Sequence, residues 1–238
     1  MGRERPGIQA NYLPTPCERF LEVCCGAAHM CLTAARKFAQ SACGVDINSR
    51  AIRFAEFNRQ LNGIGGVSTY SGDLFEPVQS KVFDWIVAHP PYAPALVDSI
   101  ACRDAGTDGE RVSTDVIREL PHYLSDGGEF YGYLLLSDRR DAPAECRVRD
   151  MLGAEGKELD VALLVLSEWS AVAFVSDRAG ASRGSKENEE LIEACRKLGI
   201  SKFLTAALTI RTRRGSSPST LRHPAFGWQT VQTMADHL

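Results

Sequence analysis

Residues 21–28 read Leu-Glu-Val-Cys-Cys-Gly-Ala-Ala, and this stretch decides the fold because an apolar run passes through small residues into a helical pattern at His29. Small residues let a backbone approach a ligand closely, and the first turn of a helix points free N–H groups at it. Asp46 follows Gly26 by 20 residues, at the end of the next predicted strand, where a carboxylate can accept from both hydroxyls of a ribose. The stretch therefore predicts a site for a nucleoside-containing cofactor; the alternative is a tight strand–helix turn with an unrelated acid.

The same turn argues against a dinucleotide cofactor. A dinucleotide-binding turn carries Gly-x-Gly-x-x-Gly, so that the pyrophosphate can sit on it. Here the three places hold Cys24, Gly26 and His29, so one glycine remains and the histidine crowds the helix start. A nicotinamide-dependent dehydrogenase is disfavoured, and a cofactor without a pyrophosphate is favoured.

Strand and helix patterns continue outward from this stretch. Their alternation in the first half of the chain predicts strand–helix units and a mostly parallel sheet. Strands are predicted at residues 20–24, 44–47, 67–71, 83–88, 129–136, 160–166 and 203–212. Helices are predicted at residues 29–38, 49–61, from about 109, 145–152 and 189–198, where Pro121 ends or kinks the third of them and Asp126-Gly-Gly forms a turn.

The 238 residues suit one large domain or one domain with an elaboration. We expect an N-terminal segment over residues 1–19 and a main domain over residues 20–212. A helical insertion is expected within that domain at about residues 168–200, with the polar centre 177–188 as a loop. Residues 213–238 are expected to form a C-terminal tail.

The composition excludes several classes of protein. With 44% apolar and 24% charged residues, the chain has the ordinary globular mix. No apolar run approaches the roughly 18 residues of a membrane span, and the N-terminus lacks the apolar stretch of a secretory signal. None of the eight cysteines belongs to a Cys-x-x-Cys pair, so no metal site is predicted and the thiols are expected to be reduced. We expect a soluble, cytoplasmic protein.

The charge is unevenly distributed. The net charge of −3 is not that of a general nucleic-acid binder, which would be basic. From Ser201 onward, however, one acidic residue, Asp236, stands against five basic ones: Lys202, Arg211, Arg213, Arg214 and Arg222. Solvated basic side chains at a strand end are the favoured interpretation, and a contact for an anionic ligand is the alternative.

Two further motifs follow predicted strands. Asp73, in Gly72-Asp-Leu-Phe-Glu-Pro77, comes just after the strand 67–71, where open α/β sheets bind ligands; it could accept from an exocyclic amine such as that of adenine, or simply form a turn. The strand 83–88 ends abruptly in His-Pro-Pro-Tyr92. Two prolines fix the backbone and remove two N–H donors, which leaves carbonyl groups free to face a cleft.

Together these motifs resemble the class I S-adenosylmethionine-dependent methyltransferases over residues 20–136. Pro-Pro-Tyr is similar to the Asn/Asp-Pro-Pro-Tyr motif of the amino-methylating branch. The loop 21–26, the turn 72–77 and the segment Asp108-Gly-Glu…Asp126-Gly-Gly look like the release-factor glutamine methyltransferases. The resemblance implies a doubly wound, Rossmann-like α/β fold with seven mostly parallel strands, helices on both faces and an antiparallel last strand.

The resemblance also implies a cofactor and its contacts. S-adenosyl-L-methionine would be the methyl donor, and S-adenosyl-L-homocysteine the product. The first loop would line the methionine part, Asp46 would hold the ribose hydroxyls, Ile47 would lie against the adenine, and Asp73 with Leu74 would fix the adenine edge. The cofactor-binding residues so implied are Glu22, Cys24, Cys25, Gly26, Ala27, Asp46, Ile47, Asp73, Leu74 and His89.

His89, Pro90 and Tyr92 are the catalytic residues that the resemblance implies. The family holds the two N–H groups of an amide or aromatic amine with an Asn side-chain oxygen and a Pro carbonyl. This chain has His89 in place of the Asn. A neutral imidazole offers one acceptor nitrogen and one donor, and it could also act as a general base for a hydroxyl or carboxylic acid. Tyr92 would stack on a planar acceptor.

Three functions remain open from the sequence. The first is methyl transfer to a nitrogen or oxygen of a small molecule, which is favoured because few residues precede the first strand, the charge is acidic and position 89 is His. The second is methylation of a protein glutamine or of a nucleic-acid amino group. The third is a non-catalytic cofactor-binding protein. A small-molecule acceptor is therefore expected before a protein or nucleic acid, with no membrane partner and no prediction of oligomeric state.

Overall fold

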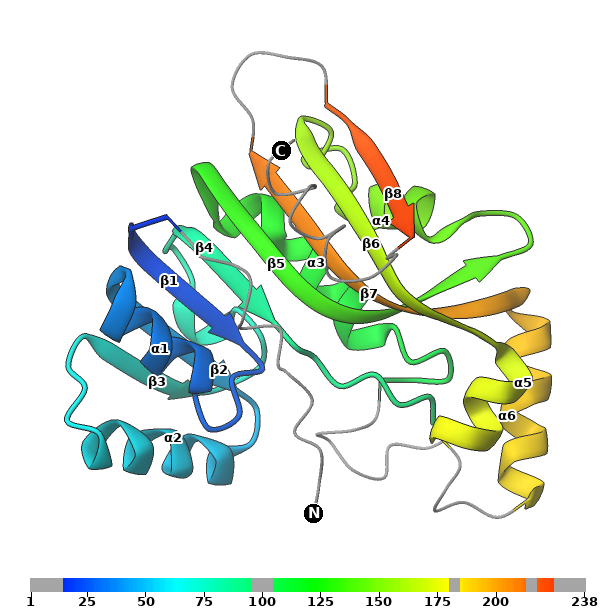
Figure 1. The fold of residues 1–238 in the computed structure, drawn as a ribbon, viewed down its shortest axis with the longest axis horizontal. Coiled ribbons are helices and arrows are strands. Elements are labelled where there is room, and N and C mark those ends of the chain that lie inside the picture. The colour runs from blue at the N-terminus through cyan, green and yellow to red at the C-terminus, as the bar shows by residue number, and fades with distance from the viewer. Residues whose placement is uncertain (1–14, 96–104, 180–184, 213–217, 225–238) are drawn as a thin grey trace.

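The computed structural model describes residues 15–95, 105–179, 185–212 and 218–224. Within these ranges the strands form one sheet in the order β3-β2-β1-β4-β5-β7-β6-β8 (Figure 1). The strands are β1 (Cys17–Val23), β2 (Ala39–Asp46), β3 (Val67–Ser71), β4 (Phe83–Ala88), β5 (Leu124–Arg139), β6 (Leu159–Ser170), β7 (Ile200–Thr212) and β8 (Thr220–Pro224).

The pairing confirms the predicted fold class. Strands β1 to β5 are parallel to one another, and β7 runs antiparallel to both β5 and β6. The expected number of seven strands is too low, because β8 adds an eighth at the edge, parallel to β6. Parallel neighbours need crossover connections, and three helices supply them here: α1 (His29–Lys37), α2 (Ser49–Leu61) and α3 (Arg111–Tyr123). A fourth helix, α4 (Ala144–Leu152), joins β5 to β6, which lie on either side of β7.

Helices cover both faces of the sheet, as predicted. Because side chains alternate along a strand, neighbouring residues of β5 face different cores. Leu134 and Leu136 pack in the core that contains α3 and α4 residues such as Ile117. Tyr131 packs with α1 and α2 in a second core, and Leu135 packs with α6 (Ser185–Lys197) in a third. Helix α6 therefore lies on the same face as α1 and α2.

Several predicted boundaries are wrong in informative ways. The Asp126-Gly-Gly segment belongs to β5, which starts at Leu124 and shifts register between its pairings with Phe83 and Trp85. Helix α3 continues two residues past Pro121. The expected loop at 177–188 is partly helical, because a π-helix, η3, spans Phe174–Ala179 after the short α5 (Ala171–Ala173), and α6 begins at Ser185. Residues 180–184 lie outside the described ranges.

A segment of the expected tail, β8 at Thr220–Pro224, is part of the sheet. In β8, Arg222 binds both carboxylate oxygens of Asp138 at 2.8 and 2.9 Å and Glu145 at 3.1 Å. Lys202 pairs with Glu168 at 2.7 Å. These basic side chains thus pair within the fold, whereas Arg213 and Arg214 lie outside the described residues.

Among the helices that the structure describes, none has the length and apolar character needed to cross a membrane.

Candidate functional site

The predicted site residues meet at one edge of the sheet. Val23 of β1 pairs with Val45 of β2 on one side and with Ala88 of β4 on the other. Each of these residues stands at or next to the carboxyl end of its strand. Asp46, Cys24 and His89 therefore follow one another in this order across the same edge, which is where open α/β sheets bind their ligands.

The loop after β1 has an unusual backbone. Cys24, Gly26 and Ala28 all have positive φ angles, of 57°, 53° and 60°. Short hydrogen bonds hold this shape: the Cys25 N–H donates to the Val45 carbonyl at 3.0 Å, and the Ala28 N–H donates to the Cys25 carbonyl at 2.8 Å. A Cβ added at Gly26 would meet no atom within 4 Å. The loop thus turns open backbone toward the edge, as a ligand that contacts main-chain atoms requires.

Asp46 ties this loop to the next strand. Its Oδ2 accepts from the Gly26 N–H at 2.8 Å, and its Oδ1 accepts from the Asn48 N–H at 2.8 Å. The side chain is only half-buried, and each carboxylate oxygen can accept more than one hydrogen bond. The carboxylate is therefore fixed in place and still has acceptor capacity toward the edge, which suits a pair of ribose hydroxyls.

Glu22 caps the helix that follows the loop. Its side chain is buried, and its oxygens accept from the Cys31 N–H at 2.8 Å and the Met30 N–H at 3.4 Å at the start of α1. Burial raises the pKa of this carboxyl to about 7, although the two backbone N–H groups oppose the rise. Because the Glu22 carboxyl already binds the free N–H groups at the N-terminus of α1, this end of the helix is unsuited to a phosphate. In its ionised form the carboxyl favours a cationic group nearby. The prediction against a pyrophosphate cofactor fits this arrangement.

The predicted turn at residues 72–77 lies beside Asp46. The Gly72 N–H donates to the Asp46 carbonyl at 3.1 Å, and the Asp73 carbonyl accepts from the Glu76 N–H at 2.8 Å. A Cβ at Gly72 would come within 2.4 Å of Pro77, so glycine is required for this turn to close. Asp73 is exposed, as is Ile47, an aliphatic side chain with 59% of its surface accessible. The edge thus offers an acid and an apolar surface next to the carboxylate.

Thiols of the first loop are not nucleophiles. Burial raises the pKa of Cys24 to about 12, with help from the neighbouring carboxylates Asp46 and Asp73, and raises the pKa of Cys25 well above its usual range. A thiol is reactive as the thiolate, so both residues stay protonated near neutral pH. Their contribution to this loop is shape and apolar contact.

His89 stands between two tyrosine rings. The Tyr92 ring stacks on it with centroids 5.7 Å apart and an angle of 23°. The Tyr133 ring meets it edge-on at 5.2 Å and 85°. The imidazole is exposed on one side, but the partial loss of water around it lowers the pKa of His89. The ring is therefore neutral at pH 7, and one nitrogen is an acceptor.

Tyr133 is absent from the predicted site, although its ring forms one wall of it. It lies on β5, 44 residues after His89, and reaches the site because Ala88 of β4 pairs with Gly132. Alternation along β5 is the signal that could have indicated it, since Tyr131 and Tyr133 share one face of the strand. Pro90, by contrast, is buried directly after His89, as a residue that fixes the backbone would be.

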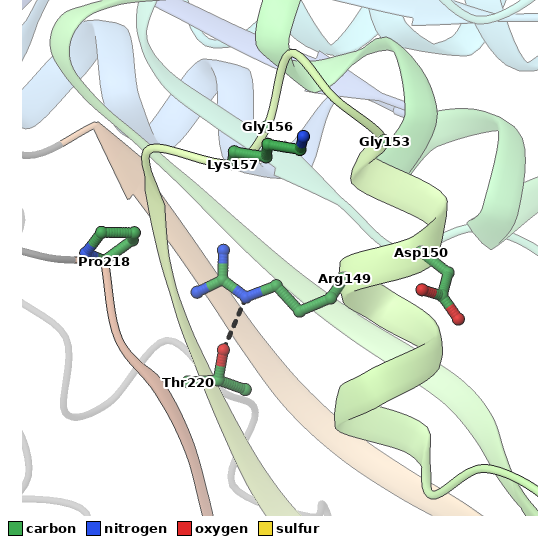
Figure 2. A pocket seen from close by; sticks show the side chains of 7 residues that line it. All are labelled: Arg149, Asp150, Gly153, Gly156, Lys157, Pro218 and Thr220. Carbon is green, nitrogen blue, oxygen red and sulfur yellow. Dashed lines mark hydrogen bonds between the residues drawn. The ribbon is translucent and has the colours of Figure 1, made fainter.

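A second depression lies away from this edge, between the end of α4 and β8 (Figure 2). Its lining includes Arg149, Lys157 and Thr220. Arg149 donates to the Thr220 hydroxyl at 2.5 Å, to the Leu159 carbonyl at 2.6 Å and to the Ser219 carbonyl. The guanidinium thus binds β8 to α4 and β6, and its role in this depression is structural.

Known proteins match the chain in sequence and in fold. A family model described as a methyltransferase domain matches residues 15–156, which include the whole edge described above. A protein of Methanocaldococcus jannaschii that bears the name protein N5-glutamine methyltransferase is 39% identical over 114 residues, 45% of this chain and 57% of that protein. The ribosomal protein uL3 glutamine methyltransferase of Bradyrhizobium diazoefficiens is 33% identical over 130 residues, 48% of this chain and 40% of that protein.

The matched region is only part of these relatives. A release factor glutamine methyltransferase of Thermodesulfovibrio yellowstonii is 27% identical over 122 residues, 46% of this chain and 44% of that protein, so the chain spans about half the length of the relatives it matches. Among solved structures, the YcgJ protein of Bacillus subtilis has a TM-score of 0.51 at 16% identity, over 84% of this chain and 94% of that one. At this identity the likeness concerns the fold alone.

These matches decide four of the predictions. They confirm the resemblance to class I methyltransferases, the prediction of an enzyme and S-adenosylmethionine as the methyl donor of the class. The expectation of a small-molecule acceptor is wrong, because the relatives are named for glutamine side chains of proteins. Net charge and the short segment before the first strand were poor guides, since a protein acceptor need place only one side chain at the edge.

Proposed function

Because the chain belongs to the methyltransferase domain family, we propose that it transfers a methyl group from S-adenosylmethionine to the side-chain amide nitrogen of a glutamine in a protein. The observation that carries the proposal is the similarity, at 39% and 33% identity, to proteins named for that reaction. The proposed catalytic unit is the domain at residues 20–212, extended by β8, and its substrate is a loop or terminus that can present one glutamine.

The residues at the edge fit S-adenosylmethionine. Asp46 would hold the ribose hydroxyls, and Ile47, Asp73 and Leu74 would surround the adenine. The loop of Cys24, Cys25, Gly26 and Ala27 would contact the methionine part, and Glu22 would favour its positive charges. When bound, the cofactor supplies a methyl group already activated on a sulfonium, so positioning and exclusion of water are what the protein must add.

The His89–Tyr92 loop would hold the acceptor. A glutamine amide has two N–H groups, and their alignment decides where the nitrogen points. Neutral His89 offers one acceptor, and the Pro90 carbonyl would be the second, in the place that the family gives to a Pro carbonyl. The rings of Tyr92 and Tyr133 would bind the flat faces of the amide by stacking and edge contact. The low pKa of His89 keeps its acceptor nitrogen available at pH 7.

A labelling experiment tests the proposal. The purified protein is incubated with tritiated S-adenosylmethionine and with a cell extract divided into protein, nucleic-acid and small-molecule pools. We expect label in the protein pool, and a glutamine heavier by one methylene in its tryptic peptides. His89→Ala should abolish the label and His89→Asn should retain it, because Asn also accepts an N–H.

His122→Ala is the matched control, since His122 is an exposed histidine paired with Glu155 at 2.9 Å, on the far end of α3. Its label should equal that of the wild type. Label that appears in another pool, or on a residue other than glutamine, would refute the proposed acceptor.

A further inference from the structure

The loop that carries His89 and Tyr92 rests on the segment before α3. Two backbone hydrogen bonds, of 3.2 and 2.9 Å, join residues 93–95 to residues 105–106. Behind them, a Cβ added at Gly109 would lie 2.7 Å from the Tyr92 carbonyl oxygen and 2.9 Å from Leu135. Gly109 also has a φ of +74°. The backbone at Gly109 is therefore in direct contact with the loop, and its position determines where Tyr92 stands.

A buried cluster of charges fixes the residue next to Gly109. Glu110 is fully buried, and its carboxylate accepts from the Ser137 N–H at 2.6 Å, from Arg147 at 2.8 and 2.6 Å, and from Arg139 at 3.0 Å. Asp108 binds Arg139 at 2.7 Å and accepts from the Glu110 N–H at 3.0 Å. The cluster thus contains two acids and two arginines, and its charges balance.

The members of this cluster come from three separate elements. Glu110 is the N-cap of α3, Ser137 and Arg139 belong to β5, and Arg147 belongs to α4. A buried ionic cluster of this kind contributes little more stability than well-packed apolar side chains would, but its directional hydrogen bonds admit few arrangements. The cluster therefore fixes the start of α3 against β5, the strand that also carries Tyr133.

We propose that Glu110 is a positioning residue, which acts through Gly109 to hold the His89–Tyr92 loop in the geometry that the acceptor requires. The expected effect of Glu110 on methyl transfer rests on the proposed function. In the part of the chain that the structure describes, the Glu110 carboxylate is bound by Ser137, Arg139 and Arg147, and none of the three belongs to the edge proposed for the cofactor. Its effect should fall on the acceptor half of the site alone.

The test uses the full chain with Glu110→Gln, which keeps the shape of the side chain and removes its charge. Gly109→Ala is the second variant: it leaves the ionic cluster intact and pushes on the Tyr92 carbonyl directly. Arg222→Gln is the matched control, because Arg222 also binds two acids, Asp138 of β5 and Glu145 of α4, and neither acid is a ligand of the arginines that bind Glu110.

Three quantities are measured for each variant: the Kd for S-adenosylmethionine, kcat/KM for the acceptor protein, and the pKa of His89 by NMR. A displacement of about 1 Å in a positioned group costs on the order of 100-fold in rate, so we expect kcat/KM to fall between tenfold and 100-fold in Glu110→Gln and Gly109→Ala. The Kd should stay unchanged, and the pKa of His89 should rise toward its ordinary value as the ring is freed. Arg222→Gln should change none of these three.

Two results would overturn the inference. One is a folded Glu110→Gln variant, or a folded Gly109→Ala variant if the first does not fold, in which His89 keeps its pKa. The other is an equal loss of kcat/KM in Arg222→Gln, which would mean general destabilisation. The NMR measurement needs no acceptor, so it tests the positioning role even if the wild-type protein methylates no glutamine and the proposed function fails.

Discussion

Replacing Glu22 by Gln tests the electrostatic account of the cofactor edge. The carboxyl is buried at the end of β1 and accepts from the N–H groups of Met30 and Cys31. A Gln side chain has the same shape and keeps one oxygen for Cys31. What the substitution removes is the ionisable proton, so the difference between the two proteins isolates the titration of this group.

The magnitude follows from the pKa. Burial raises it from 4.5 to about 7 in the folded protein, so the folded chain holds a proton that the unfolded chain has released between these two pH values. The stability contributed by this group is thus complete below pH 4.5 and is lost as the pH rises through 7. At roughly 1.4 kcal/mol for each unit of pKa, the loss amounts to about 3 kcal/mol.

Urea denaturation at pH 4.5, 5.5, 6.5 and 7.5 measures this difference. The unfolding free energy of Glu22→Gln relative to wild type should move by about 3 kcal/mol in favour of the variant over that range. Titration of His89 occurs in both proteins and cancels. Glu76→Gln is the control for the removal of a carboxyl group from an exposed position. A difference for Glu22→Gln that varies with pH no more than that of Glu76→Gln would refute the reasoning.

Cofactor binding should respond in the opposite sense. The positive charges of S-adenosylmethionine favour the ionised carboxyl, so the affinity of the wild type should rise between pH 6 and pH 8. Calorimetric titration should also show proton release near pH 7, measured as a dependence of the heat on the buffer. Glu22→Gln should bind more weakly at pH 8, with no such dependence. Proton release of equal size from both proteins would assign it to another group.

Three further predictions follow from the described contacts. Gly26→Ala should weaken S-adenosylmethionine binding at least tenfold in a calorimetric titration, because the added Cβ enters the open space proposed for the cofactor. The φ of +53° at this position should also cost about 1 kcal/mol in stability. An affinity equal to that of the wild type would contradict the placement of the cofactor. Tyr133→Leu should lower kcat/KM for the acceptor about tenfold and shift the His89 resonances, with the cofactor Kd unchanged; unchanged kinetics would remove Tyr133 from the site. Arg222→Gln should lower the unfolding free energy by about 1–3 kcal/mol, as measured with urea, and leave methyl transfer intact; a loss of activity would show that β8 bears on the site.

Local sequence was sufficient to predict the bounds of a helix or strand where residues adjacent in the chain decide them. The strand at 83–88, the helix at 49–61 and the strand at 67–71 have the predicted bounds, because each apolar pattern is closed by a turn or a capping residue. The turn at Gly72 was likewise readable, since its glycine and Pro77 are close in sequence. The order of acids and small residues after these strands was enough to indicate the cofactor edge.

Strand β8 could not be predicted in this way. Thr220–Pro224 has no apolar alternation, and its extended form depends on pairing with β6 and on the ion pairs of Arg222 with Asp138 and Glu145. The start of β5 at Leu124 could not be predicted for a similar reason. The Asp-Gly-Gly sequence that follows it is typical of a turn, and the strand begins at Leu124 only because this residue pairs with Phe83 of β4.

The sequence by itself determined the fold class, the family and most of the residues that we propose for the cofactor, because strand–turn–helix units carry their own signals in adjacent residues. The tertiary structure alone decided the acceptor side. Tyr133 faces His89 only through the register of β4 on β5, and Glu110 is fixed near the loop only by β5 and α4. Residues far apart in the chain come together through sheet register and buried charge pairing, and neither leaves a local pattern.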